Sequence, residues 1–148
     1  MTKLIRIRSL LILAAVVFLS GSGCSSHGEG PAFEEAWVRA IPPGMKMTAG
    51  FGRLSNRGSK VIEFNAFSSS SFDDVSLHRT ELHDGISKML EVPVLSIEAG
   101  ETVVLEPGSY HLMLMMPRVE IQPGQLIDIE MIASDGRSIT FQVPVEER

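Results

Sequence analysis

The chain has 148 residues and carries 13 basic against 18 acidic side chains, for a formal net charge of −5. This length suits one domain with a sizeable core, and the acidic balance argues against a nucleic-acid partner, because phosphate binding needs a basic surface. A single cysteine excludes an intrachain disulfide or a dithiol redox couple.

Residues 1–23 have the composition of an export signal. A basic start is followed by an apolar stretch at 10–19, which is short for a membrane span. Small residues then lead into Cys24, and this pattern predicts cleavage before the cysteine and lipid attachment to its thiol. The alternative is an ordinary signal peptide cut nearby, which leaves a free Cys24.

Removing this signal leaves 10 basic against 18 acidic side chains, a formal charge of −8. Residues 24–33 are rich in Ser and Gly and are expected to form a flexible tether. Residues 34–148 are then the folded domain. We expect it in the periplasm or cell envelope, attached to the membrane only through the lipid anchor.

From residue 34 onward, short runs of strand-forming residues are separated by turn signals about once every ten residues. No stretch has convincing helical periodicity, so the sequence predicts an all-β sandwich or barrel. The expected strands are 34–41, 48–55, 60–67, 74–82, 87–92, 101–106, 110–116, 125–133 and 138–144.

Four residues in this series have side chains suited to one metal ion, namely His78, Met89, His111 and Met113. Thioether sulfur is a soft, neutral ligand that favours Cu(I). Zinc usually takes thiolate, imidazole or carboxylate ligands, and magnesium and calcium take oxygen. Two imidazoles with two thioethers therefore predict a site for monovalent copper.

The spacing suits a site on one face of a sheet. Alternate side chains of a strand share a face, so His111 and Met113 are expected to point outward together. The alternation of the earlier strand places His78 on the outer face as well. Asp84-Gly85 predicts a hairpin that brings Met89 back toward these residues.

The pattern of His78, ten residues, Met89, twenty-one residues, His111, one residue and Met113 resembles the signature of the PCuAC-type periplasmic copper chaperones. Further similarity lies in Ala36-Trp37-Val38-Arg39-Ala40, Pro42-Pro43-Gly44, Ala49-Gly50-Phe51, Ile97-Glu98-Ala99-Gly100 and the run from Pro107 to Met115. The resemblance implies a cupredoxin-like Greek-key β-sandwich that binds Cu(I) through the four residues of the signature. It also implies delivery to the copper-bearing subunit of cytochrome oxidase, alongside thiol-bearing assembly factors.

Other methionines divide between auxiliary and core positions. Met115 shares the expected outer face of the signature strand, where it would either support the ligands from behind or replace one of them. Met45 and Met47 follow a Pro-Pro-Gly turn, in a candidate loop to fold over the metal. Met116 and Met131 are in phase with apolar neighbours and are expected in the core.

Enzyme functions are poorly supported by the sequence. No Ser-His-acid set or nucleophile elbow is evident, and a blue-copper carrier needs a cysteine within the domain. We therefore expect a metallochaperone and not an enzyme. Two alternatives stay open: a copper storage or tolerance protein, and an exported lipoprotein that uses its methionines as a protein-binding patch.

Overall fold

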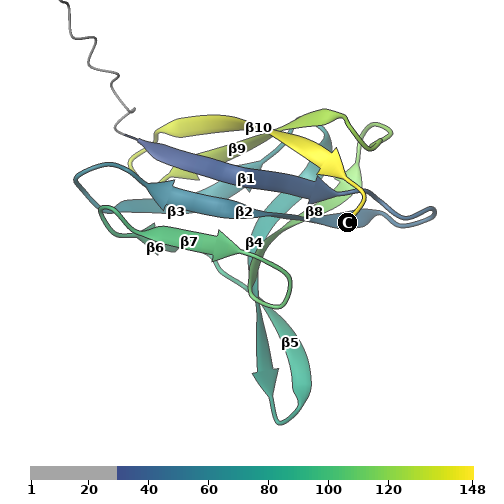
Figure 1. Ribbon diagram of the computed structural model, residues 1–148, viewed down its shortest axis with the longest axis horizontal. Coiled ribbons are helices and arrows are strands. Elements are labelled where there is room, and N and C mark those ends of the chain that lie inside the picture. Colours follow the sequence, from purple (N-terminus) through teal and green to yellow (C-terminus); the bar gives the residue numbers. More distant parts are fainter. Residues whose placement is uncertain (1–29) are drawn as a thin grey trace, which may run out of the picture.

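The computed structural model describes residues 30–148, and this part of the chain is all-β, with ten strands and no helix (Figure 1). Cys24, the signal segment and most of the expected tether lie outside the described residues. Within the described part, no helix is long and apolar enough to span a membrane. The strands are β1 (Pro31–Arg39), β2 (Met47–Asn56), β3 (Ile62–Ser68), β4 (Phe72–His83), β5 (Ile86–Glu91), β6 (Leu95–Ile97), β7 (Thr102–Leu105), β8 (Tyr110–Pro117), β9 (Leu126–Ala133) and β10 (Ser138–Glu146).

The strands form one continuous sheet in the order β5-β4-β8-β7-β2-β1-β10-β9-β3-β6. A further pairing of β3 with β4, at Phe67 and Val75, closes the sheet on itself as a flattened sandwich. The first strand lies between β2 and the last strand β10, so many sheet neighbours are far apart in the sequence, as a Greek-key arrangement requires. The expected fold class is confirmed.

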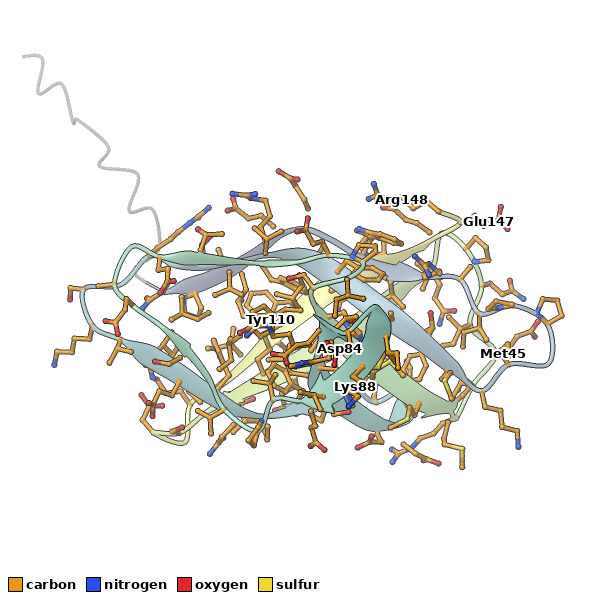
Figure 2. The ribbon with its side chains drawn as sticks, turned by 90° about the horizontal axis from the view of Figure 1, so that it is seen from below. Met45, Asp84, Lys88, Tyr110, Glu147 and Arg148 are labelled. Atoms are coloured by element: carbon orange, nitrogen blue, oxygen red, sulfur yellow. The ribbon has the colours of Figure 1, made fainter. Side chains whose placement is uncertain are left out.

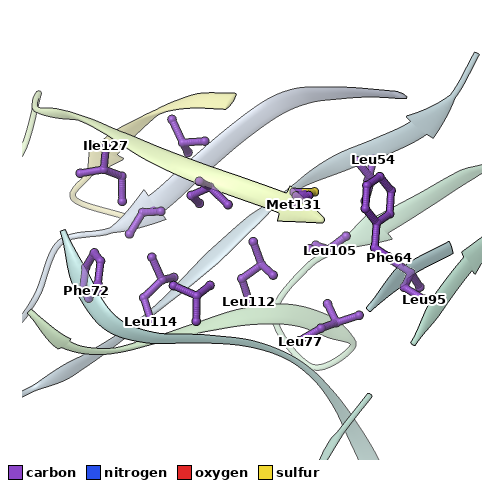
Figure 3. Packing of buried hydrophobic residues seen from close by; sticks show 14 of the residues in the cluster. Leu54, Phe64, Phe72, Leu77, Leu95, Leu105, Leu112, Leu114, Ile127 and Met131 are labelled. Carbon is purple, nitrogen blue, oxygen red and sulfur yellow. The ribbon is translucent and has the colours of Figure 1, made fainter. Parts of the chain in front are cut away.

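The core fills the space between the two layers of the sandwich (Figure 3). Every strand except the exposed β5 contributes side chains to it, in alternation where the strand is regular, as in β8, where Leu112 and Leu114 are fully buried. Leu77 of β4 and Met131 of β9 meet them from neighbouring and facing strands. Burial of each such side chain contributes roughly 1.5–3 kcal/mol, and the expectation that Met131 lies in the core is confirmed.

A β-bulge in β1 decides which of its side chains face outward. The pairing of β1 with β2 shifts between Glu34 and Trp37, and Glu35 has a φ of 50°. The extra residue exchanges the two faces of the strand, so that Phe33 before the bulge and Val38 after it both turn toward the core. Trp37 is thereby placed on the outer face.

Some boundaries differ from the sequence-based expectation. Strand β1 begins at Pro31, before the expected strand at 34–41, and Phe33 already packs edge-on against Phe141 with ring centroids 5.8 Å apart. Strand β6 has three residues, too few to give a periodic signal. Met116 is 52% exposed and not in the core, because its φ of 56° breaks the alternation of β8.

Candidate metal centre

Strands β4 and β8 place His78 directly opposite His111 in their antiparallel register. The two imidazole rings lie 6.1 Å apart between centroids and are inclined by 30° to each other. Both residues belong to the outer face of the sheet, as the alternation of the sequence predicts. His111 is nevertheless only 4% exposed, because the outer face is covered at this point.

One nitrogen of each ring is held by a neighbouring oxygen. Nδ1 of His111 lies 3.0 Å from the backbone carbonyl of Ser109, which accepts a hydrogen bond from it. Nε2 of His78 lies 3.0 Å from the hydroxyl of Ser76. Such bonds fix the orientation of an imidazole and leave its other nitrogen as the ligand atom.

The other nitrogens, Nδ1 of His78 and Nε2 of His111, are buried and have no hydrogen-bond partner among the described residues. Buried polar atoms in proteins nearly always have a partner, so two orphaned nitrogens on facing rings need an explanation. A metal ion bound between the strands supplies one, because a neutral imidazole donates a lone pair to it.

The two methionines of the signature reach this place from different strands. Met113 is half-buried on β8, between Ser76 of β4 and Ala49 of β2 in the sheet register. Met89 is 52% exposed on β5, opposite Thr80. Because Thr80 lies two residues beyond His78 on β4, register places Met89 on the same outer face.

A cavity of about 210 Å³ brings three of the four predicted ligands together. It is lined by Arg39, Ala49, Phe51, Thr80, Met89, Pro107, Gly108, His111 and Met113. His78 lies beside His111 but is not part of this lining. The lining of the cavity is mostly apolar. A soft cation with neutral ligands suits such surroundings better than a strongly hydrated cation does.

Elements far from the signature form one wall of the cavity. The guanidinium of Arg39 lies 5.4 Å from the centre of the Phe51 ring and 5.9 Å from that of Trp37. Those two rings are themselves 4.7 Å apart. This wall could not be predicted from the sequence. The hydrophobic pattern does not reveal the bulge in β1, and that bulge turns Trp37 outward.

The three auxiliary methionines do not line the cavity. Met115 and Met47 are opposite each other on β8 and β2, on the outer face but further along the strands. Met45 lies in the preceding loop and is 53% exposed. Within residues 30–148 no three side chains among His, Cys, Asp and Glu are grouped to hold a metal ion.

A family model described as "Putative lipoprotein LpqE-like" matches residues 32–145 of the chain. "Putative lipoprotein Lxx21020" from Leifsonia xyli subsp. xyli (strain CTCB07) is 33% identical over 99% of this chain and 94% of its own length. The chain belongs to the LpqE-like family. The similarity of the chain to the family model and to the Leifsonia relative extends over the strands that carry the candidate metal centre.

Solved structures relate this LpqE-like protein to the PCuAC domains. The solution structure of Cu(I)-DR1885 from Deinococcus radiodurans matches with a TM-score of 0.65 and 26% identity, over 86% of this chain and 84% of that one. The copper-bound PCuAC domain from PmoF2 matches with a TM-score of 0.67 and 16% identity, over 82% of this chain and 95% of that one, a likeness of fold alone. The resemblance to PCuAC-type proteins is confirmed.

Proposed function

We propose that this LpqE-like protein is an exported copper(I) chaperone that holds Cu(I) through His78, Met89, His111 and Met113. The observation that carries the proposal is the pair of buried, unpartnered ring nitrogens on facing strands. A cavity beside them holds the two thioethers of the same set. The structurally similar DR1885 of Deinococcus radiodurans, whose solution structure is of the Cu(I) form, supports the choice of metal.

Neutral ligands suit a protein that must also release its cargo. Imidazole and thioether groups bind Cu(I) without the tight grip of several thiolates, so transfer to a thiolate-rich acceptor runs downhill. Thioethers cannot be trapped as disulfides in an oxidising compartment, although they remain open to sulfoxidation. The protein's residues need only bind and orient the ion, and no bond is made or broken in a substrate.

The acceptor we propose is the copper-bearing subunit of cytochrome oxidase, reached alongside thiol-bearing assembly factors. The proposal extends the PCuAC-type resemblance to the partners of that family. The proposed location is the periplasm or cell envelope, with Cys24 carrying a lipid anchor. The lipoprotein name of the Leifsonia relative supports this location.

Competition titration of Cu(I) against a chelator tests the proposal. The parent protein should bind one equivalent tightly, and His78→Ala or His111→Ala should weaken that binding by at least about tenfold, as expected when a ligand worth ~1.4 kcal/mol or more is lost. His83→Ala is the matched control, because His83 is 64% exposed near the hairpin turn and beside Glu81. Equal losses in all three variants, or no binding by the parent, would exclude this site.

A protein-binding module is the second candidate, and one observation favours it. The β4–β5 hairpin projects from the body of the sandwich (Figure 1). It exposes Leu82 to 75% and Ile86 to 63%, which is unusual for large apolar side chains without a partner. If Leu82→Ser and Ile86→Ser abolish capture of a partner while the protein binds no Cu(I), this function replaces the first.

A further inference from the structure

A row of thioethers continues along the outer face beyond the candidate metal centre. On β8, Met115 follows Met113 at the next outward position. Met47 of β2 lies directly opposite Met115, on the side away from β4. Ala49 lies opposite Met113, between Met47 and Phe51 on the outer face of β2. Because its side chain is small, it does not cover the row of thioethers.

The far end of the row is exposed to solvent. Met47 is 45% exposed and Met45 is 53% exposed, so packing of the core does not account for either. Figure 2 shows Met45 at one end of the molecule, away from the hairpin turn at Asp84. Large apolar side chains gathered at a surface mark a place where something binds.

Backbone hydrogen bonds fix the segments that carry the three methionines. The amide of Met45 donates to the carbonyl of Pro42 at 3.0 Å, which closes the turn before β2. The amide of Met116 donates to the carbonyl of Lys46 at 2.8 Å and so ties the end of β8 to the start of β2. Met47 and Met115 are directly opposite each other in an antiparallel strand pair. The Cβ atoms of residues so placed lie about 4.5–5.5 Å apart, so two flexible thioethers can reach each other.

We propose that Met45, Met47 and Met115 form a second site for a soft monovalent cation, Cu(I) or its analogue Ag(I). Three neutral sulfurs without a hard ligand select such an ion over zinc, magnesium or calcium. Asp74 lies opposite Met115 on β4, so its carboxylate adds a negative charge near the site without being one of the three ligands. The role of this site as a staging position for copper rests on the proposed function, whereas its preference for a soft cation rests on the three sulfurs alone.

The second site is weaker than the first, because it lacks imidazole and is open to water. Its position one step along β8 from Met113 makes it a place where an ion can rest before entering the first site or after leaving it. Met113, a ligand of the first site, is the neighbour of Met115 on the same face of β8, so it is within reach of an ion moving along the row. The direction of that movement depends on the relative affinities of donor and acceptor.

Titration of the folded protein with Ag(I), followed by NMR of ¹³C-labelled methionine methyl groups, tests the second site. The first equivalent should shift the methyl signals of Met89 and Met113. The second equivalent should shift those of Met45, Met47 and Met115. Met47→Leu combined with Met115→Leu keeps the side-chain volume and removes two sulfurs, so the second equivalent should be lost and the first retained.

Met116→Leu is the matched control, because Met116 is about as exposed as Met45 and Met47 but takes no part in the Met47 and Met115 pairing. It should bind two equivalents, as the parent does. His78→Ala combined with His111→Ala should lose the first equivalent and keep the second. A parent that binds one equivalent, lost in the histidine variant and kept in the methionine variant, would overturn the second site while leaving the proposed function intact.

Discussion

His78 and His111 face each other across two neighbouring antiparallel strands, and each presents an unpartnered buried nitrogen. The sheet register fixes their separation before any metal arrives, with ring centroids 6.1 Å apart. A hydrogen bond between the Ser76 hydroxyl and His78, and one that the Ser109 carbonyl accepts from His111, hold the opposite edges of the two rings. A site prepared in this way loses little conformational freedom on binding an ion, which favours affinity.

Binding of Cu(I) should weaken as the pH falls, because protons compete for the two imidazoles and not for the thioethers. In the acid range the logarithm of the affinity should fall with a slope approaching about 2 per pH unit. Replacing one histidine, as in His78→Met, should reduce this slope to about 1. Chelator-competition titrations from pH 5 to pH 8 measure both slopes.

The control for this pH series is His83→Ala, which should keep the slope of the parent. A parent profile that is flat across the range would show that methionines alone bind the ion. The site of two imidazoles and two thioethers would then be excluded, whatever the absolute affinity.

Gly52 should resist substitution, because it lies against the bulge of β1. A Cβ atom at this position would come within 2.7 Å of the Phe33 ring and 2.9 Å of the Ala36 Cα, and the glycine φ is 152°. Gly52→Ala should lower the free energy of unfolding by about 1–3 kcal/mol, the usual cost of overpacking. Denaturant unfolding measures this, with Gly30→Ala as control, since nothing lies within 4 Å of a Cβ there.

Much of the geometry of the candidate metal centre could be predicted from strand periodicity alone. Alternation placed His111 and Met113 on one face, and the Asp84-Gly85 turn returned Met89 beside β4, as the register of the two strands bears out. These relations are local in sequence or depend on one short hairpin. Local relations are the ones that a sequence pattern can express.

The surroundings of the centre depend on contacts between distant strands, and the sequence does not display them. The bulge at Glu35 reverses the faces of β1 and brings Trp37 beside Phe51. The same reversal carries Arg39 to the cavity wall. A pattern of two-residue period would have assigned this strand one continuous inward face, so the aromatic wall could not be predicted.

The pKa of Glu130 is lowered from its ordinary value, chiefly by a hydrogen bond from the Ser138 hydroxyl and then by one from Ser68 at 2.7 Å. Because the lowered pKa belongs to the folded state, the charged carboxylate stabilises the fold above its ordinary titration range. That contribution is lost as the pH falls through the lowered value. Ser138→Ala should raise the pKa of Glu130 more than Ser68→Ala does, and ¹³C NMR titration of the carboxyl group would show equal values if these bonds are absent in solution.

Cys24→Ser should prevent lipid attachment and release the protein from the membrane fraction. We expect this loss because the hydroxyl of serine cannot replace the thiol that the lipid modifies. Metabolic labelling with a fatty acid measures the attachment, and Cu(I) affinity of the purified domain should stay unchanged. If the parent incorporates no label, Cys24 is not a lipidation site and the anchor must be abandoned.

The two proposed sulfur ligands should respond differently to truncation, because Met89 is 52% exposed on an edge strand while Met113 is half-buried between two strands. Met89→Ala should leave the free energy of unfolding within about 0.5 kcal/mol of the parent, whereas Met113→Ala should lower it by roughly 1 kcal/mol or more. Either change should weaken Cu(I) binding by about tenfold or more. Denaturant unfolding of the metal-free protein and chelator competition measure the two effects separately.

Leucine variants separate the sulfur from its packing. Met113→Leu keeps most of the buried volume, so stability should return to near that of the parent while the affinity for Cu(I) stays low. Met89→Leu should behave like Met89→Ala, since little packing is lost at an exposed position. If Met113→Leu restores both stability and affinity, Met113 acts through packing alone and the sulfur ligand must be sought elsewhere on the outer face.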